Sequence, residues 1–339
     1  TDCGRCQENC PAYLTEKPLS PWKVIKNLRQ HLLAPLDNNG SANYSLVDRV
    51  VTADEIWSCT TCLACQEICP VAIEHLHKIV EIRRNQVLEK SQFPMELRKV
   101  FRNLEIYGDP FGMGKARRLD WSRGLTSDNF STEPERKYDY LLFVGCNGAF
   151  IEHNQEPVKN LIQLISDNGF SVGILGKEEL CCGDPVRRLG NEFLFQQLVN
   201  KNLSVLRKYK FGKILTTCPH CFNTLKFEYP YFSSEYNFEV IHHTQLLHQF
   251  LKEGRLTFNS EYGKKVVFHD PCYLGRYNNI YNPPREVIDS IPGLNRIETQ
   301  TTKERSFCCG GGGGSFFMEE KFGKKINKTR LEEILQLHP

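Results

Sequence analysis

Fifteen cysteines, bunched into short motifs, constrain this 339-residue chain more than any other feature of its sequence. The disulfide frameworks of secreted domains seldom require cysteines to be bunched in this way, and an odd number leaves one thiol without a disulfide partner. The first residues are polar and include cysteines, so they do not resemble a secretion signal. We therefore expect a reducing compartment and cysteines that bind metal.

The charge and hydropathy patterns exclude two classes of function. The net charge of +3 comes from 43 basic and 40 acidic residues, a balance that argues against a nucleic-acid partner. No stretch approaches the roughly 18 consecutive apolar residues that a membrane span requires. Any membrane contact is expected to come through another polypeptide or through a segment that is not in this chain.

The clearest motif is a CxxCxxCxxxCP run, in which Pro70 follows the last of four cysteines: Cys59, Cys62, Cys65 and Cys69. In ferredoxins the three closely spaced thiolates of such a run bind one 4Fe–4S cluster, and the fourth thiolate binds a neighbouring cluster. Two-residue gaps in a tight turn allow three sulfur atoms to reach three corners of one cluster. The run therefore predicts a two-cluster ferredoxin.

The N-terminal segment repeats this run without its first cysteine, which would fall immediately ahead of Thr1, so we expect that the chain begins one residue late. The crossed pattern predicts one 4Fe–4S cluster bound by Cys3, Cys6 and Cys69, and a second bound by Cys10, Cys59, Cys62 and Cys65. A pair of zinc sites is the alternative. Zinc ribbons, however, use paired CxxC knuckles and not three cysteines followed by Cys-Pro.

A second type of motif begins where the sequence changes to short apolar runs that alternate with helices, which is typical of parallel α/β units. We expect strands at 140–144, 172–175, 213–216 and 238–241, and helices at 158–165 and 193–206. The cysteines that follow the first three strands are Cys146, Cys181, Cys182, Cys218 and Cys221, with Gly183 after Cys182. The carboxyl ends of parallel strands meet at one edge, so we expect five thiolates at one site.

The same layout starts again near 266–268. Cys272 follows the expected strand, and Cys308-Cys309-Gly310 comes after a gap that matches the first copy. No CxxC pair follows, and the spacing would place that pair beyond Pro339, so occupancy of this second site is left open. Gly310 and Gly311 either form a flexible linker or let the backbone approach a cluster, and we favour the cluster.

Other residues near the motifs receive structural interpretations. His269, beside Cys272, and His220, between two cysteines, are expected to donate or accept hydrogen bonds next to ligands. Arg117 and Arg118 could dock an acidic redox partner, although a solvated surface is the preferred interpretation. Ser20 and Pro21 predict the start of a helix, and a further apolar pattern predicts a helix over 73–87.

These observations give the fold class α+α/β, an α-helical two-cluster ferredoxin domain followed by two α/β repeats. The expected domains are 1–100 for the ferredoxin, 101–137 for a linker, 138–262 for the first repeat and 263–339 for an incomplete second repeat.

The five-cysteine arrangement resembles the CCG domains of the heterodisulfide reductase catalytic subunit, which recur in the iron–sulfur subunits of glycolate and lactate oxidases. The resemblance implies a 4Fe–4S cluster, of the non-cubane type in that family, at Cys146, Cys181, Cys182, Cys218 and Cys221.

Several strings are similar to a narrower group, the membrane-bound electron-transfer-flavoprotein:menaquinone oxidoreductases. They are CGRCQENCPAY, KPLSP, IWSCTTC and HDPCYLGR. This resemblance implies a flavoprotein electron donor, a cytochrome-b-like membrane domain or subunit, and a quinone acceptor at the cytoplasmic side of the cell membrane of an anaerobe.

Four functions follow as hypotheses. The first is an electron conduit in which no residue breaks a substrate bond. The second is a disulfide reductase that uses the five cysteines from Cys146 to Cys221 as its catalytic site. The third is the iron–sulfur subunit of a glycolate- or lactate-type dehydrogenase, and the fourth is a zinc-binding interaction module.

Overall fold

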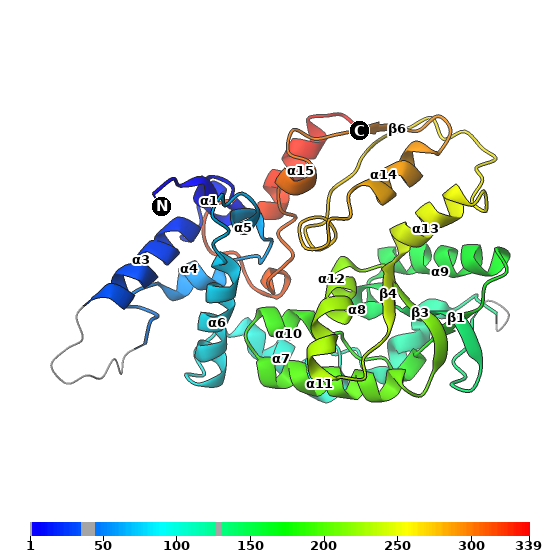
Figure 1. Ribbon diagram of the computed structural model, residues 1–339, viewed down its shortest axis with the longest axis horizontal. Helices are drawn as coiled ribbons and strands as arrows, with labels where there is room; N and C mark the ends of the chain where they lie inside the picture. The colour runs from blue at the N-terminus through cyan, green and yellow to red at the C-terminus, as the bar shows by residue number, and fades with distance from the viewer. Residues whose placement is uncertain (1, 35–44, 127–129) are drawn as a thin grey trace.

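The computed structural model describes residues 2–34, 45–126 and 130–339, and its N-terminal part is helical (Figure 1). The helices of this part are α1 (Arg5–Glu8), α2 (Pro11–Leu14), α3 (Pro21–Leu33), α4 (Ala53–Trp57), α5 (Ala64–Glu67), α6 (His75–Leu88) and α7 (Glu96–Tyr107). Four of the first five contain only four or five residues. Short helices of this kind leave much of the backbone in the turns that hold the cysteines.

The two helices expected from the sequence in this part are confirmed. Ser20 Oγ accepts a hydrogen bond from the backbone N–H of Lys23 at 3.2 Å, and Pro21 is the first residue of α3. A side-chain oxygen at this position satisfies one of the N–H groups that a helix start leaves without a partner. The second expected helix is α6, which begins at His75 rather than at residue 73.

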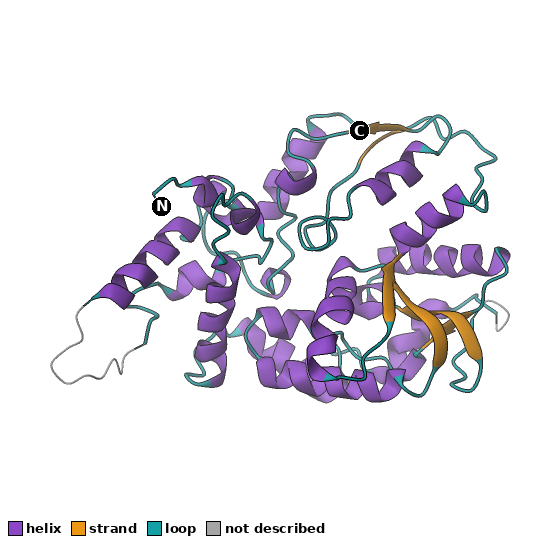
Figure 2. Ribbon diagram, viewed as in Figure 1, coloured by secondary structure: helices purple, strands orange, loops and turns teal. Residues whose placement is uncertain are grey.

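The first repeat contains a four-stranded parallel sheet in the order β2-β1-β3-β4, as the alternating pattern predicted (Figure 2). The strands are β1 (Lys137–Phe143), β2 (Val172–Ile174), β3 (Lys210–Thr216) and β4 (Glu239–His242). The intervening helices are α8 (Gly145–Phe150), α9 (Glu152–Asp167), α10 (Asp184–Arg188), α11 (Glu192–Leu206), α12 (Pro219–Asn223) and α13 (His243–Lys252). Asn168 ends α9, and Gly169 follows it with a positive φ.

Both faces of this sheet are buried, because alternate side chains of a strand point to opposite faces. Leu141 and Phe143 of β1 pack in a core with α7 and α11. Tyr140 and Leu142 pack in a second core with α9 and α13. The sheet is therefore held between two helical layers, and its carboxyl edge remains as the place where the cysteine loops gather.

The segment 101–137, expected to be a linker, is instead packed against the first repeat. Helix α7 covers its start, and a 3-10 helix spans Lys115–Ser122. Trp121 in that helix is only 1% exposed and belongs to the core on the α9 side of the sheet. The sequence of this segment is mostly charged residues and glycines, so the few buried residues that pack it against the sheet were not evident. Residues 127–129 of the expected linker lie outside the described part of the chain.

The second repeat contains β5 (Lys265–Val267), α14 (Asn282–Asp289), β6 (Asn295–Ile297) and α15 (Ile326–Leu335). β5 pairs in parallel with β6, as β1 pairs with β2. The segment before α15 returns to the N-terminal helices, where Lys17 Nζ donates to Phe322 O at 3.0 Å and to Lys324 O at 2.6 Å. The mixture of helices and parallel sheets agrees with the predicted fold class.

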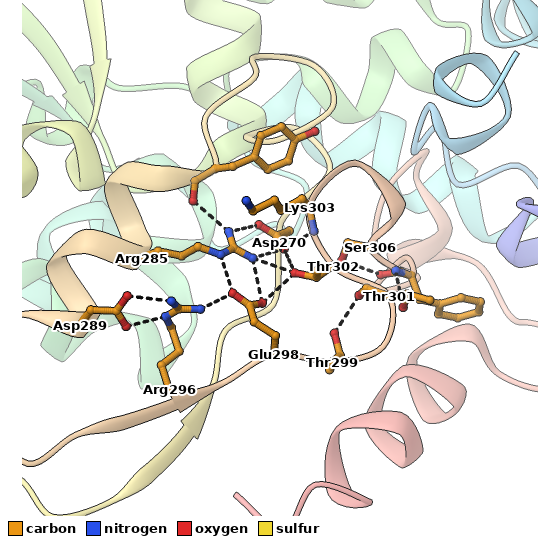
Figure 3. Close-up of polar contacts among 12 residues, drawn as sticks. Asp270, Arg285, Asp289, Arg296, Glu298, Thr299, Thr301, Thr302, Lys303 and Ser306 are labelled. Atoms are coloured by element: carbon orange, nitrogen blue, oxygen red, sulfur yellow. Dashed lines mark hydrogen bonds and ion pairs between the residues drawn. The ribbon is translucent and has the colours of Figure 1, made fainter. Parts of the chain in front are cut away.

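An ion-pair network supports the loop that leads to Cys308 (Figure 3). Arg285 donates to both carboxylate oxygens of Asp270, at 2.6 and 2.7 Å, and also contacts Glu298. Asp270 in turn accepts from the backbone N–H of Lys303 at 2.7 Å. Asp270, beside proposed ligands in the sequence, therefore has a structural partner.

Within the described ranges, no helix combines the length and the apolar character needed to cross a membrane.

Replacement of Arg285 tests the network. Arg285 is 5% exposed, and removal of one partner from a buried ion pair costs about 3–5 kcal/mol, because the remaining charge is left uncompensated. We expect Arg285→Met to lower the free energy of unfolding of the second repeat by roughly that amount, measured by urea denaturation. Arg305→Met at an exposed position of the same loop serves as the control. Equal stability of the two variants would contradict this role for the network.

Candidate iron–sulfur sites

One cysteine of the N-terminal motif and three of the second motif surround one cavity between the first helices, which we call the inner site. The cavity is lined by Cys10, Cys59, Cys62 and Cys65. Burial, followed by the charges of Cys62 and Cys59, raises the pKa of Cys10. The structure thus brings together the four residues that the crossed pattern assigned to one cluster.

The other three ferredoxin cysteines form the outer site. Cys3, Cys6 and Cys69 line one pocket together with Trp22. Burial raises the pKa of Cys6, and the nearby charges of Cys69 and Cys3 contribute to the same shift. Cys69 therefore lies with the first motif rather than with its own, as the crossed pattern requires.

Local backbone geometry explains how these turns present their thiols. Gly4 and Leu63, at equivalent positions of the two motifs, have φ angles of 73° and 64° and precede short helices. A left-handed residue there changes the direction of the chain between the two cysteines of each CxxC pair. Backbone N–H groups also point at sulfur, as with Ile73 N and Cys69 Sγ at 3.3 Å. Such bonds stabilise negative charge on a ligand.

The five cysteines of the first repeat make a continuous chain of thiol contacts at the carboxyl edge of the sheet. The contacts run from Cys146 through Cys181, Cys182 and Cys221 to Cys218. Cys221 Sγ lies 3.4 Å from Cys182 Sγ. Gly183 follows Cys182 in the sequence and has a φ of 92° at the start of α10. A Cβ atom at this position would lie 2.5 Å from the Phe195 side chain. The loops after three strands therefore converge as expected.

Arg118 belongs to this first CCG site, and the preferred solvated interpretation was wrong for it. Its side chain is 3% exposed, and Nη1 lies 3.5 Å from Cys146 Sγ. Glu179 pairs with Arg118 at 2.5 Å and accepts backbone N–H groups from Val144 and Gly145. Arg117, in contrast, is largely exposed beside Asp120. Sequence alone gave no signal, because Glu179 reaches this pair from a different loop.

His220 joins the first site to the second repeat. Its Nδ1 lies 2.9 Å from Asp184. Burial by itself would lower the pKa of His220, but the charge and the hydrogen bond of Asp184, with the nearby charges of Cys218 and Cys309, together raise it to about 9. The ring stacks on Tyr273 with 3.9 Å between centroids. The Tyr273 hydroxyl in turn hydrogen-bonds the hydroxyl of Thr61 at 2.9 Å. This series of contacts links the first CCG site to the ferredoxin loop, and the sequence did not reveal it.

The cysteines of the second repeat lie against the inner site. Cys272 and Cys308 share an apolar cluster with Cys62. Thr60 Oγ1 is 3.4 Å from Cys308 Sγ, and a hydrogen bond with Cys308 is the largest of the effects that lower the pKa of Cys62 to about 6. His269 accepts a hydrogen bond from Arg330 and contacts Cys309. The second repeat is therefore a direct neighbour of the ferredoxin.

Residues Gly310–Gly314, which we call the glycine run, lie between the ferredoxin loop and the first repeat. A Cβ on Gly312 would lie 2.5 Å from Thr60 O, and one on Gly313 would lie 2.5 Å from Cys59 O. Gly310 has a φ of 83° and follows the Cys308–Cys309 pair, whereas a Cβ on Gly311 would meet only Cys309 Sγ at 3.8 Å. The run is therefore packed against the loop that contains Cys59 and Thr60, and it is not a flexible linker.

Fitness for iron–sulfur clusters follows from the donor sets. A 4Fe–4S cluster takes one soft thiolate ligand for each of its four irons. The four thiols around the inner cavity match this donor set, and a bound cluster would supply one-electron chemistry.

Comparison with known proteins agrees with these motifs. A family model described as "4Fe-4S dicluster domain" matches residues 1–73, and one described as "Cysteine-rich domain" (CCG) matches 140–226 and 266–339. A dihydromethanophenazine:CoB–CoM heterodisulfide reductase subunit from Methanosarcina barkeri is 30% identical over 90% of this chain and 76% of its own length. The chain belongs to the heterodisulfide-reductase-like family of CCG-domain iron–sulfur oxidoreductases.

Two further relatives of this CCG family are longer. An EtfAB:quinone oxidoreductase from Syntrophomonas wolfei is 40% identical over 99% of this chain and 52% of its own length. A probable iron–sulfur-binding oxidoreductase, FadF, from Bacillus subtilis is 37% identical over the whole chain and 53% of its own length. The chain thus spans about half the length of these curated relatives. No solved structure matches the chain.

The domain limits at residues 100, 137 and 262 stay a prediction.

Serine substitutions test the crossed assignment of ligands. If Cys10 belongs to the inner site, Cys10→Ser and Cys65→Ser should each remove the same electron paramagnetic resonance signal of the reduced protein. Cys6→Ser and Cys69→Ser should remove a different signal. Each loss should lower the iron content by about four atoms per chain. Grouping of Cys10→Ser with Cys6→Ser would contradict the crossed arrangement.

The close approach of the glycine run gives a second test. Gly313→Ala should destabilise the protein by about 1–3 kcal/mol, because the new methyl group would overlap a backbone carbonyl. Gly311→Ala, in the same run but without such a contact, should be nearly neutral. Thermal unfolding with anaerobically prepared protein measures both. Equal melting temperatures for the two variants would show that the run is not packed as described.

Proposed function

We propose that this chain is the iron–sulfur part of an oxidoreductase that passes electrons from a reduced flavoprotein, through its clusters, toward a membrane quinone. The observation that carries this proposal is the contact between Cys62 of the inner site and Cys308 of the second repeat. Electrons move efficiently only between closely spaced centres, and this contact makes the ferredoxin and the CCG repeats immediate neighbours.

The proposed cofactors are two cubane 4Fe–4S clusters and one further 4Fe–4S cluster of the non-cubane type at the first CCG site. The inner site would bind one cubane through Cys10, Cys59, Cys62 and Cys65, and the outer site would contribute Cys3, Cys6 and Cys69 to the other. Cys146, Cys181, Cys182, Cys218 and Cys221 would hold the third. Cys272, Cys308 and Cys309 are proposed metal ligands of the second repeat.

The partners are proposed from the relatives and from the local strings. One relative is named EtfAB:quinone oxidoreductase and another is named a probable membrane-anchored ferredoxin. These names support an electron-transfer flavoprotein as donor and a quinone as the eventual acceptor. We place the chain at the cytoplasmic side of the cell membrane, attached through a cytochrome-b-like segment or partner outside the described structure.

A second candidate function is reduction of a disulfide at the first CCG site. Five thiols in contact are one more than a cubane cluster needs, and the heterodisulfide reductase relatives share this domain. In this alternative Cys146, Cys181, Cys182, Cys218 and Cys221 would form the catalytic site.

Reoxidation of the reduced protein separates the two candidates. Reduced electron-transfer flavoprotein should bleach the visible absorbance of the clusters, and a quinone analogue added to membranes that contain the protein should restore it. A heterodisulfide should not restore it. The flavoprotein with membranes that lack the protein is the control. Reoxidation by the disulfide, without reoxidation by the quinone analogue, would favour the alternative and contradict the proposal.

A further inference from the structure

Two arginines from distant segments bind the backbone of the loop Cys59–Cys62, and we call them the loop arginines. Arg83 of α6 donates from Nη2 to Cys59 O at 2.7 Å and from Nε to Ile56 O at 2.9 Å. Arg276 of the second repeat donates from Nε to Cys62 O at 2.7 Å. The loop that presents two inner-site thiols is thus held at both ends by a guanidinium group.

Neither loop arginine has a carboxylate partner among the described residues. Arg83 is fully buried, and its other hydrogen bonds are with the carbonyl groups of Arg188 and Gly313, at 3.0 and 2.9 Å. Its guanidinium group also lies 5.0 Å from the centre of the Trp57 ring. Arg276 makes its remaining hydrogen bonds with the carbonyls of Glu304 and Ser306. Carbonyl oxygens satisfy the N–H donors of these groups but leave their positive charge uncompensated.

Two buried arginines elsewhere in the chain have carboxylate partners that compensate their charge. Arg285 pairs with Asp270 and Glu298, and Arg118 pairs with Glu179. A buried charge is unfavourable unless an opposite charge lies nearby. The thiol that faces Arg83 is that of Cys59 in the inner site. Arg276 faces Cys62 of the inner site and also Cys272 and Cys308 of the second repeat.

The positive side chains that line the outer site are Arg5, Lys26 and Arg29, and all three are exposed to solvent, where water and salt screen their fields. Arg83 is fully buried and Arg276 is half-buried, so the charges of these two residues are screened less. The two ferredoxin sites therefore differ in electrostatic environment although their cysteine motifs are alike.

We propose that Arg83 and Arg276 are positioning residues that raise the reduction potential of the inner cluster above that of the outer one. The proposal rests on the ligand assignment of the proposed function. Reduction adds one electron, from the flavoprotein donor or from a chemical titrant, and so adds one negative charge that the two guanidinium groups stabilise. Electrons would then collect at the cluster that adjoins the CCG repeats, which gives the transfer a direction.

The experiment is an anaerobic redox titration of the full protein, followed by electron paramagnetic resonance. Arg83→Gln and Arg276→Gln remove charge but keep hydrogen-bond donors. Each should lower the reduction equilibrium constant of the inner cluster at least tenfold, which is about 59 mV for one electron. The outer signal should not move. Arg84→Gln is the matched control, because Arg84 is next to Arg83 on α6 but pairs with Glu81 at 2.8 Å.

Arg83→Lys separates charge from structure. Lysine keeps the positive charge without the planar guanidinium group. The reduction potential of the inner cluster should therefore be closer to the wild-type value in Arg83→Lys than in Arg83→Gln. A purely structural role of Arg83 predicts no such recovery. If Arg83→Gln loses the cluster, Arg276→Gln and Arg83→Lys still decide the question. Intact clusters with unchanged potentials in these variants would overturn the proposal. Absence of an inner signal in the unmodified protein would overturn the ligand assignment as well.

Discussion

The structure depends on one constraint, which is that thiols from sequence-distant turns must meet in small buried groups. Burial alone disfavours ionised thiolates, as the raised pKa values of Cys10 and Cys65 show. Buried thiolates would therefore destabilise the fold unless a metal or a positive side chain compensated their negative charge. The crossed exchange of Cys10 and Cys69 between the two ferredoxin motifs follows from the same constraint, because each motif must contribute to both sites.

The ferredoxin helices and the second repeat meet at the loop that includes Cys59 and Thr60. The glycine run reaches it from the second repeat, Arg83 reaches it from α6, and Tyr273 contacts Thr61 from beside Cys272. The close approach of the run explains why side chains are absent there. The proposed transfer of electrons between the ferredoxin and the CCG repeats requires that these parts lie in contact.

Sequence reasoning located the cysteine groups and the parallel strands, because ligand spacing and hydrophobic periodicity are local properties. It did not locate Arg118, Arg83 or the stack of His220 on Tyr273. Their significance comes from partners that lie far away in the chain, such as Glu179 for Arg118. The segment 101–137 was interpreted as a linker because its charges and glycines are more numerous than the few residues, such as Trp121, that anchor it.

Sulfur atoms from distant segments of this chain are proposed to gather around inorganic iron. Anomalous diffraction measured at the iron absorption edge, on crystals grown without oxygen, would locate that iron. We expect strong anomalous density inside the group Cys10, Cys59, Cys62 and Cys65, and again within the five-cysteine group of the first repeat. Well-ordered crystals with no iron signal at either group, or with zinc at these positions, would contradict it.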